Sequence, residues 1–474
     1  MLNIPEYKDA EAVFKYFEEI SRIPHTSSNT KHIADYLVDF AKVRGLWYMR
    51  DAADNVVIRK PATKGYENKP TVIFQGHTDM VADKTSDCTI DMDKEGLEIY
   101  RDGDLIRAKG TTLGGDDGVA VAYSLALLDS DDIEHPELEA LFTSDEEIGL
   151  IGATALDASA LKGKTMINID SDEEGVFTVG CAGGVRMDIA AGYEREAEPS
   201  ENLYRIAVSG LQGGHSGTEI DKNRANAIKV LADVIGNADG IKLVEISGGN
   251  ADNAIPRFAE CVVTIDDAKF TKENLIPTIE KIHSENEPGI KITIEELTGK
   301  KKAITNTDSA KIFKLIKKMP TGVYKMSEDI PGLPETSSNL GIIKTGDDRV
   351  ELTTSVRSSK NSEKLALCQK IRDVCKGYGA EVFERGAYPA WEYKKGSHLC
   401  DVMSRVYTEM YGKEPKIVTI HAGLECGIFS EKIPELECVS IGPDNRDIHT
   451  PEERLSISST ARVWEYLKRV LSEI

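Results

Sequence analysis

Nothing in the 474-residue sequence reads as an export signal or a membrane span. The first residues, MLNIPEYKDAEAVFKYF, lack the basic stretch and the following apolar stretch of a secretory signal. No uninterrupted apolar run reaches the roughly 18 residues that suggest a membrane-spanning helix. These absences predict a cytoplasmic protein that has no membrane partner.

The sequence also lacks closely spaced cysteine pairs, and it has fewer basic than acidic residues. The eight cysteines include no CxxC pair, and a disulfide scaffold is unusual in a long chain without an export signal, so reduced thiols are expected. Lys and Arg number 58 against 80 Asp and Glu, which gives a net charge of −22. Because nucleic acids and anionic membranes are bound largely through basic patches, this balance argues against both partners.

What is present is the composition of an ordinary globular protein, long enough for two or three domains. In the first part of the chain, apolar strand-like runs alternate with segments of helical periodicity. Strands are predicted at 70–75, 138–144, 165–170 and 175–180, and helices at 7–20, 30–44, 118–130 and 150–159. Buried strands separated by helices imply an α/β domain with a largely parallel sheet flanked by helices.

The pattern changes after residue 184. Residues 203–297 read as strand, helix, strand, strand, helix, strand, and a similar but less complete set follows, with a hairpin turn at 346–349. Each set resembles a ferredoxin-like βαββαβ unit, which makes a doubled α+β domain one interpretation. The α/β pattern then returns. We therefore predict one α/β domain formed by 1–184 and 391–474, interrupted by an inserted domain at 185–390.

Candidate metal ligands follow the predicted strands. His77 and Asp79 come directly after 70–75; imidazole is a favoured zinc donor, and Asp79 suits the role of holding the second ring nitrogen. The glycine-rich loop GTTLGGDDG (110–118) runs into a helix, a pattern that also suits phosphate. Its two adjacent carboxylates, at 116 and 117, are better suited to a cation, and capping of the helix by one Asp is the structural alternative.

Three further signals lie in later loops. Glu146 and Glu147 follow the strand 138–144, Asp170 closes the strand-like run TMINID, and His449 lies in the loop GPDNRDIHTP. Singly, each has an ordinary structural explanation, such as an acidic surface turn or a solvated histidine. Together they form the donor inventory of a two-zinc site, in which metals about 3.5–4 Å apart clamp a water and polarise a carbonyl. Mn²⁺ and Co²⁺ are alternatives to Zn²⁺.

The motifs GHTDM, GTTLGGDDG, SDEEIG, GGHSG, NAIPR, VRSS and HAGLECG resemble the metallopeptidase family of carnosinases, aminoacylases and bacterial dipeptidases. HSGTEI, HAGLECG and ECVSIGP most resemble its bacterial Xaa-His (aminoacyl-histidine) dipeptidase branch, also called cytosol non-specific dipeptidases. The resemblance runs from the first helices to the C-terminus. It implies hydrolysis of unblocked dipeptides, and it leaves open whether the second residue must be histidine and whether the protein forms a homodimer.

The resemblance also implies a role for each site residue. The metal ligands would be His77, Asp116, Glu147, Asp170 and His449, with Asp116 shared by the two zinc ions. Glu146 would be the general base, and Asp79 would orient His77.

The resemblance makes the domain formed by 1–184 and 391–474 the catalytic domain and the inserted domain at 185–390 its lid. Within that lid, His215 would be the donor that stabilises the oxyanion. Asn253, Arg357 and Gly423 would bind the substrate. Arg357 would do so by contacting the C-terminal carboxylate of the substrate. The structural alternatives are a surface ion pair for Arg357 and a local turn held by His215.

Two other functions compete with a dipeptidase. An N-acyl amino acid deacylase or desuccinylase would need the same zinc pair, because it also hydrolyses an amide beside a carboxylate. A non-catalytic peptide-binding relative would be expected to have lost Glu146 or a ligand, and all of them are present. A nucleotide-binding role for the loop 110–118 conflicts with its carboxylates, which would face the phosphates.

Overall fold

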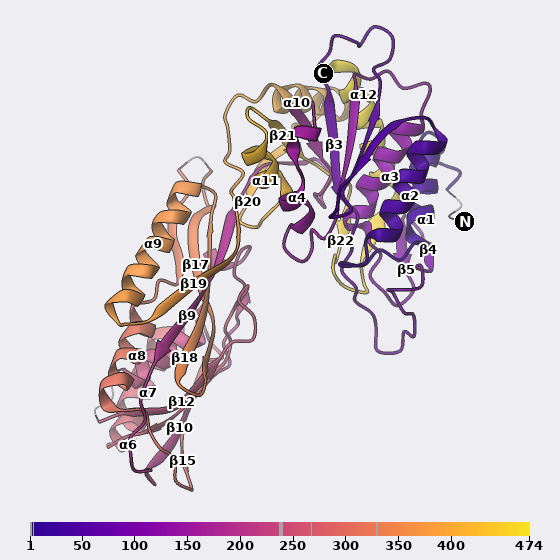
Figure 1. Ribbon diagram of the computed structural model, residues 1–474. Helices are drawn as coiled ribbons and strands as arrows, with labels where there is room; N and C mark the ends of the chain where they lie inside the picture. Colours follow the sequence, from indigo (N-terminus) through magenta and orange to yellow (C-terminus); the bar gives the residue numbers. More distant parts are fainter. Residues whose placement is uncertain (1, 3, 237–239, 267, 329) are drawn as a thin grey trace. The chain divides into compact units, whose positions relative to one another are not determined.

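The computed structural model describes residues 2, 4–236, 240–266, 268–328 and 330–474. The chain forms two compact units (Figure 1). Unit 1 comprises Met1–Cys181, Tyr393–Thr419 and Leu424–Ile474, and unit 2 comprises Ala182–Glu392 and Ile420–Gly423. Residues 420–423, which the sequence-based division gave to the catalytic domain, belong to unit 2 because they pack on its residues; Ala182 N–H, for example, donates to the carbonyls of Ile420 and Ala422.

Unit 1 is built on an eight-stranded sheet with the order β1-β2-β6-β3-β7-β21-β8-β20. Its central strands β6, β3, β7 and β21 run parallel, whereas β1–β2, β2–β6 and β21–β8 pair antiparallel. The α/β prediction is therefore confirmed, with the parallel strands in the middle of the sheet. In sheet order the strands are Trp47–Arg50, Val56–Lys60, Leu138–Thr143, Val72–His77, Thr165–Asn168, Glu437–Ser440, Val176–Cys181 and Lys416–Ile420.

The helices of unit 1 are α1 (Glu11–Ser21), α2 (Lys31–Val43), α3 (Gly115–Asp129), α4 (Ile151–Ala155), α10 (His398–Tyr411), α11 (Glu425–Lys432) and α12 (Ile457–Glu473), with short 3-10 turns at Lys8–Ala10 and Ala158–Ala160. In Figure 1, α1, α2 and α3 lie together on one side of β3, and α4 and α11 on the other. Helix α3 is apolar all round because it is buried between α1 and β3.

Helix α4 is shorter than the predicted span 150–159. The chain leaves the helix at Leu156, and the Asp157 side chain accepts the N–H of Ser159 to cap a separate 3-10 turn. Asp favours such caps over helix interiors, which explains the break.

Strand β3 and helix α3 approach so closely that Gly76 has no room for a side chain. A Cβ at this position would lie 2.3 Å from the Ala120 Cβ and 2.5 Å from Asp117 Oδ2. We expect Gly76→Ala to lower the free energy of unfolding by about 1–3 kcal/mol through overpacking, measured by urea denaturation. Gly377→Ala, at the end of α9 (Asn361–Gly377) with open space around it, is the control and should be neutral or slightly stabilising. Equal stability of both variants would contradict the close-packing argument.

A second, four-stranded sheet of unit 1 has the order β22-β23-β5-β4 and was not predicted. Its strands are Asn445–Arg446, Arg454–Ser456, Leu105–Ala108 and Ile99–Asp102, too short for periodicity to reveal. The loop between β22 and β23 carries His449, so this sheet anchors one of the candidate ligands.

Unit 2 has a nine-stranded sheet of order β15-β10-β14-β12-β17-β18-β9-β19, with β16 paired to β17. In chain order these strands are β9 (Gly183–Gly192), β10 (Leu203–Ser209), β12 (Lys242–Gly248), β14 (Ala259–Thr264), β15 (Lys291–Leu297), β16 (Gly322–Met326), β17 (Pro334–Thr345), β18 (Arg349–Ser358) and β19 (Glu381–Tyr388). A separate pair joins β11 (Gly214–His215) to β13 (Ala254–Ile255). The predicted hairpin at 346–349 is confirmed by the hydrogen bond from Gly346 N–H to the Arg349 carbonyl.

The helical elements of unit 2 are a 3-10 turn (Ile220–Lys222), α5 (Ala227–Ile235), α6 (Ala268–Phe270), a π-helical turn (Thr271–Leu275), α7 (Ile276–His283), α8 (Asn306–Lys318) and α9 (Asn361–Gly377). Figure 1 shows α7, α8 and α9 along one side of the sheet. Helices α5, α7, α8 and α9 share a continuous apolar core with the strands.

The sheet order reveals two ferredoxin-like units joined edge to edge. Strands β10, β12, β14 and β15 take the order 4-1-3-2, and β9, β17, β18 and β19 take the same order, with β12 paired to β17 at the junction. The second set is therefore complete, contrary to the sequence interpretation. Its first strand, β9, precedes the whole first unit, which is inserted between β9 and α8.

Within the described part of the chain, no helix combines the length and the apolar character that crossing a membrane requires.

Candidate metal centre

The predicted metal ligands meet at one edge of the parallel sheet of unit 1. His77 ends β3, Glu147 and Asp170 follow β6 and β7, and His449 lies beyond β21, in the loop between β22 and β23. Because these four strands run parallel, their carboxyl ends and the loops after them lie at the same edge. Asp116 reaches this edge from the first turn of α3.

Asp116 lies between the two histidines. Its Oδ1 is 3.0 Å from His77 Nε2, and its Oδ2 is 3.1 Å from His449 Nε2. Asp170 Oδ1 lies 3.8 Å from His77 Nε2, and Glu147 Oε1 lies 2.9 Å from His449 Nε2. Each oxygen of Asp116 therefore faces a different group of donors, which is the arrangement of a bridging carboxylate.

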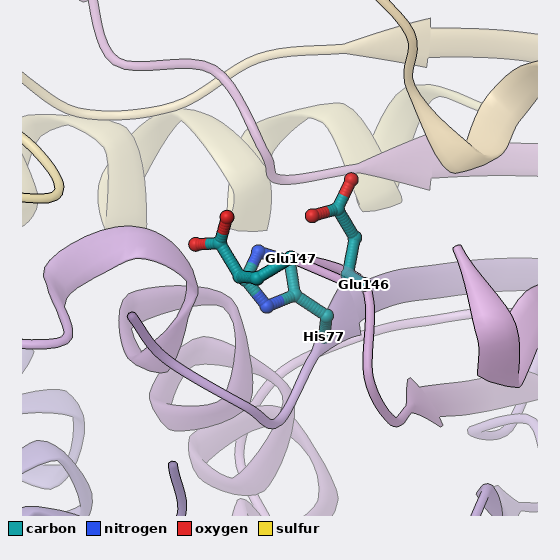
Figure 2. A group of neighbouring side chains, drawn as sticks. All are labelled: His77, Glu146 and Glu147. Carbon is teal, nitrogen blue, oxygen red and sulfur yellow. The ribbon is translucent and has the colours of Figure 1, made fainter. Parts of the chain in front are cut away.

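Among the described residues, three groups of side chains bring their donor atoms within 4.8 Å of one another. One is His77, Asp116 and Asp170; another is Asp116, Glu147 and His449; the third is His77, Glu146 and Glu147. Figure 2 shows the third group, in which the carboxylates of Glu146 and Glu147 leave adjacent backbone positions in different directions. This divergence lets one carboxylate bind a cation while the other acts on a water.

The charges of the cluster shift one another's protonation. Burial lowers the pKa of His77, but the hydrogen bonds to Asp116 and Asp79 and the charges of Asp116 and Asp170 together outweigh this and raise the pKa well above 6.5. The hydrogen bond to Asp116 also raises the pKa of His449, to about 10. Burial, reinforced by Asp116, raises the pKa of Asp170 well above 3.8, and burial raises that of Glu146 to about 8.

This donor set fits divalent cations. Without a cation, protons on His77 and His449 balance the negative charge of the carboxylates. A bound cation would supply this positive charge instead, and the two neutral rings would bind it through Nε2. Two imidazoles with three carboxylates suit Zn²⁺, and also Mn²⁺ or Co²⁺. The side chain of His77 is 1% exposed and that of His449 45%, so one donor group is closed and the other open to solvent.

Asp79 contacts three parts of this cluster from a fully buried position. The Nδ1 of His77 faces the Asp79 backbone carbonyl at 2.9 Å and its carboxylate at 3.6 Å. The same carboxylate accepts the backbone N–H of Glu146 at 2.9 Å and of Glu147 at 3.3 Å. Asp79 thus contacts His77 as the sequence suggested, and it also fixes the loop that carries the two glutamates.

A buried polar network beneath the site escaped the sequence analysis. Glu425 Oε2 accepts hydrogen bonds from Gln75 Nε2 and Thr143 Oγ1, both at 2.6 Å, and Asn168 Nδ2 donates to Gln75 Oε1 at 2.6 Å. Gln75, Thr143 and Asn168 lie on the three strands that lead to candidate ligands. The motif HAGLECG contains Glu425, but no local pattern shows that it faces these strands.

In unit 2, His215 both holds a local turn and keeps a free donor. Its Nδ1 accepts the backbone N–H of Thr218 at 3.1 Å and of Gly217 at 3.3 Å. Burial lowers the pKa of His215, and the charge of Arg357 adds to this effect. The neutral ring accepting at Nδ1 carries its proton on Nε2, which is the tautomer that an oxyanion donor needs.

The other predicted residues of unit 2 have different surroundings. Arg357 makes no ion pair with any described residue, which disfavours the surface-pair alternative; its Nη1 donates to the Tyr388 hydroxyl at 3.2 Å. A Cβ on Gly423 would lie 2.8 Å from the Tyr388 ring, so glycine is needed there. Asn253 is exposed, and its backbone carbonyl accepts the N–H of Ser216 at 2.8 Å.

The sequence analysis also missed two neighbours of Arg357 in unit 2. Ser337 lies directly opposite Arg357 in the β17–β18 pair, and its Oγ is 2.7 Å from His421 Nε2. Burial lowers the pKa of His421 to about 3, and the charge of Arg357 contributes. His421 is the first residue of HAGLECG, so the motif gave a signal, but the pairing with Ser337 required the register of the sheet.

Comparison with known proteins agrees with this fold and this donor set. The model of peptidase family M20/M25/M40 matches residues 73–473. The cytosol non-specific dipeptidase of Escherichia coli (strain K12) is 36% identical over 474 residues, with 98% of both chains covered. The crystal structure of aminoacylhistidine dipeptidase from Vibrio alginolyticus has a TM-score of 0.90 and 34% identity, covering 98% of this chain and 96% of that one.

A tripeptidase from Staphylococcus aureus, at 17% identity and a TM-score of 0.59 over 97% of both chains, shares the fold. The fold and the site define a metal-dependent hydrolase. The chain belongs to peptidase family M20/M25/M40. The predictions of a metallopeptidase and of its family are confirmed.

Proposed function

We propose that this protein is a cytoplasmic dipeptidase that uses two Zn²⁺ ions to hydrolyse unblocked dipeptides, Xaa-His and others. The observation that carries the proposal is the pair of donor groups that share Asp116, one with His77 and Asp170 and the other with Glu147 and His449. The full-length likeness to dipeptidases from Escherichia coli and Vibrio alginolyticus supports the substrate class, and the first of these relatives supports the location.

When bound, a pair of divalent cations polarises the scissile carbonyl and lowers the pKa of a water. The rest of the reaction falls to the chain's own residues. Glu146 accepts a proton from the attacking water and returns it to the leaving amine. Asp79 holds the tautomer of His77 and fixes the backbone of Glu146, so that the base keeps its place beside the cations.

Residues of unit 2 are proposed to act on the substrate itself. The Nε2–H of His215 would stabilise the negative charge on the carbonyl oxygen, which its neutral state and the acceptor role of Nδ1 support. Arg357, which has no acidic partner among the described residues, would bind the terminal carboxylate, with Asn253 and Gly423 as further substrate contacts.

An N-acyl amino acid deacylase is the competing function, because the same donors would serve it. A substrate panel separates the two. We expect the metal-stripped protein to be inactive and to regain cleavage of Ala-His, β-Ala-His and Leu-Gly with Zn²⁺, Mn²⁺ or Co²⁺, while N-acetyl-Met and a tripeptide stay intact. Cleavage of N-acetyl-Met alone would replace the dipeptidase assignment with the deacylase; no cleavage of any substrate would sink both.

A further inference from the structure

The glycine-rich loop at the start of α3 already holds a carboxylate from a distant part of the chain. Glu453 Oε2 accepts the backbone N–H of Leu113 at 2.7 Å and of Gly114 at 3.0 Å. Its Oε1 accepts the N–H of Gly115 at 2.9 Å and of Asp116 at 3.2 Å. The first N–H groups of a helix lack partners within the helix, and they attract anions. Glu453 therefore occupies the position that a phosphate would take. It also caps the helix, a role that the structural alternative gave to one of the aspartates.

Among the described residues, five donors direct hydrogen bonds at this carboxylate. Besides the four backbone N–H groups, Asn445 Nδ2 donates to Glu453 Oε1 at 3.1 Å. Burial, to which the charge of Asp116 adds, raises the pKa of Glu453 above its usual value, although the hydrogen bonds from Asn445 and the backbone act against this. A Cβ on Gly115 would lie 2.8 Å from Asn445 Nδ2 and 3.1 Å from Glu453 Oε1, so glycine permits the approach. The surrounding groups enclose the carboxylate completely; Glu453 is 2% exposed.

The same residue belongs to the loop that carries His449. Glu453 lies between β22 and β23, and its backbone N–H donates to the carbonyl of Thr450 at 3.1 Å. Its side chain therefore ties the His449 loop to the backbone of Asp116. These are the two residues whose side chains face each other at 3.1 Å in the candidate metal centre.

We propose that Glu453 is a positioning residue of the metal centre, holding the loops of Asp116 and His449 at the separation at which both can bind the same cation. It touches neither substrate nor metal and acts through the backbone of Asp116. The inference rests on the proposed two-metal function, and it assigns to Glu453 a role beyond capping α3.

Glu453→Gln tests the proposal because an amide cannot accept from all of these donors. Its NH₂ group must face either the N–H groups of Leu113 and Gly114 or those of Gly115 and Asp116. Asn445 Oδ1 has no hydrogen-bond partner among the described residues, so a rotated Asn445 amide can accept from that NH₂ group. The orientation in which the NH₂ group faces Gly115 and Asp116 is therefore favoured, and it leaves the N–H of Asp116 unpaired.

The measurement is a Zn²⁺ titration of the metal-stripped protein against a chromophoric chelator, which needs no catalytic activity. We expect Glu453→Gln to weaken Zn²⁺ binding about 10- to 100-fold, the usual effect of losing a residue that supports a metal ligand. Asn445→Ala removes one donor and leaves the carboxylate in place. It should fold normally and weaken Zn²⁺ binding about fivefold, the size of one hydrogen bond.

Glu139→Gln is the matched control. Glu139 is also fully buried in unit 1, and its carboxylate accepts the N–H groups of Lys162 and Gly163 at 2.9 Å and the Nε of Arg59 at 2.7 Å. Its loss should lower thermal stability without changing Zn²⁺ affinity. Equal weakening of Zn²⁺ binding in both glutamine variants, or none in Glu453→Gln and Asn445→Ala, would overturn the positioning role. A wild-type protein that binds no Zn²⁺ would instead overturn the proposed function itself.

Discussion

Glu146→Gln is expected to lower kcat for dipeptide hydrolysis by about 10²- to 10⁴-fold while leaving the bound metal in place. The amide keeps the size of the side chain but cannot accept a proton from water. Glu146 and Glu147 point in different directions from neighbouring positions, and of the two only Glu147 lies in the group with Asp116 and His449. The loss should therefore fall on the chemical step. Steady-state kinetics together with zinc content per chain checks both parts.

The neighbouring acid supplies the control for this experiment. Asp145 belongs to the same SDEE motif, and its Oδ1 accepts the backbone N–H of Ser28 at 2.6 Å, a contact that an asparagine oxygen can keep. Asp145→Asn should therefore retain activity within about tenfold, since exposed or replaceable contacts are worth little. If Glu146→Gln lost zinc along with activity, Glu146 would be a ligand, as its group with His77 and Glu147 allows, and the base would have to be sought elsewhere.

The candidate metal ligands His77, Glu147 and Asp170 were accessible to sequence reasoning because each follows a strand of the same sheet. Asp116 was accessible through the glycine-rich loop that precedes α3. A strand is recognised from local residues, and parallel strands bring their ends together without any knowledge of long-range contacts. Residues that act across the sequence lack such a local signal. Glu453 accepts a hydrogen bond from the backbone of Leu113, and Glu425 accepts one from the side chain of Gln75. In both pairs the partners are separated by most of the chain.

The nine-stranded sheet of unit 2 shows the same limit at the level of topology. Strand β9 alternates the buried residues Val185, Met187, Ile189 and Ala191 with more exposed ones, so its existence was predictable. Its partners β18 and β19 follow only after the whole first ferredoxin-like unit. No local sequence pattern predicts that β9 pairs with strands on the far side of such an insertion. The second set therefore looked incomplete from the sequence, although both sets have the same strand order.

Asp116→Ala is expected to lower kcat/KM by about 10³-fold or more and to reduce the zinc content from two ions per chain to at most one. The side chain offers one oxygen to each histidine, so its removal takes a ligand from both donor groups at once. A metal that polarises a carbonyl contributes several kcal/mol to the reaction, and about 4 kcal/mol corresponds to about 10³-fold in rate. Zinc analysis of the purified variant, alongside kinetics with excess Zn²⁺, measures both effects.

Asp117→Asn separates the bridging role from the general effect of removing a carboxylate at this edge of the sheet. Asp117 directly follows Asp116 in the sequence and is more deeply buried. Its Oδ2 accepts the backbone N–H of His77 at 3.2 Å, and Asp117 belongs to none of the three donor groups. An asparagine oxygen can accept the same N–H, so two zinc ions should remain bound. If Asp117→Asn lost as much zinc as Asp116→Ala, the metal would depend on the total negative charge of the loop. The geometry that gives each oxygen of Asp116 its own histidine would then not be what holds the two ions together.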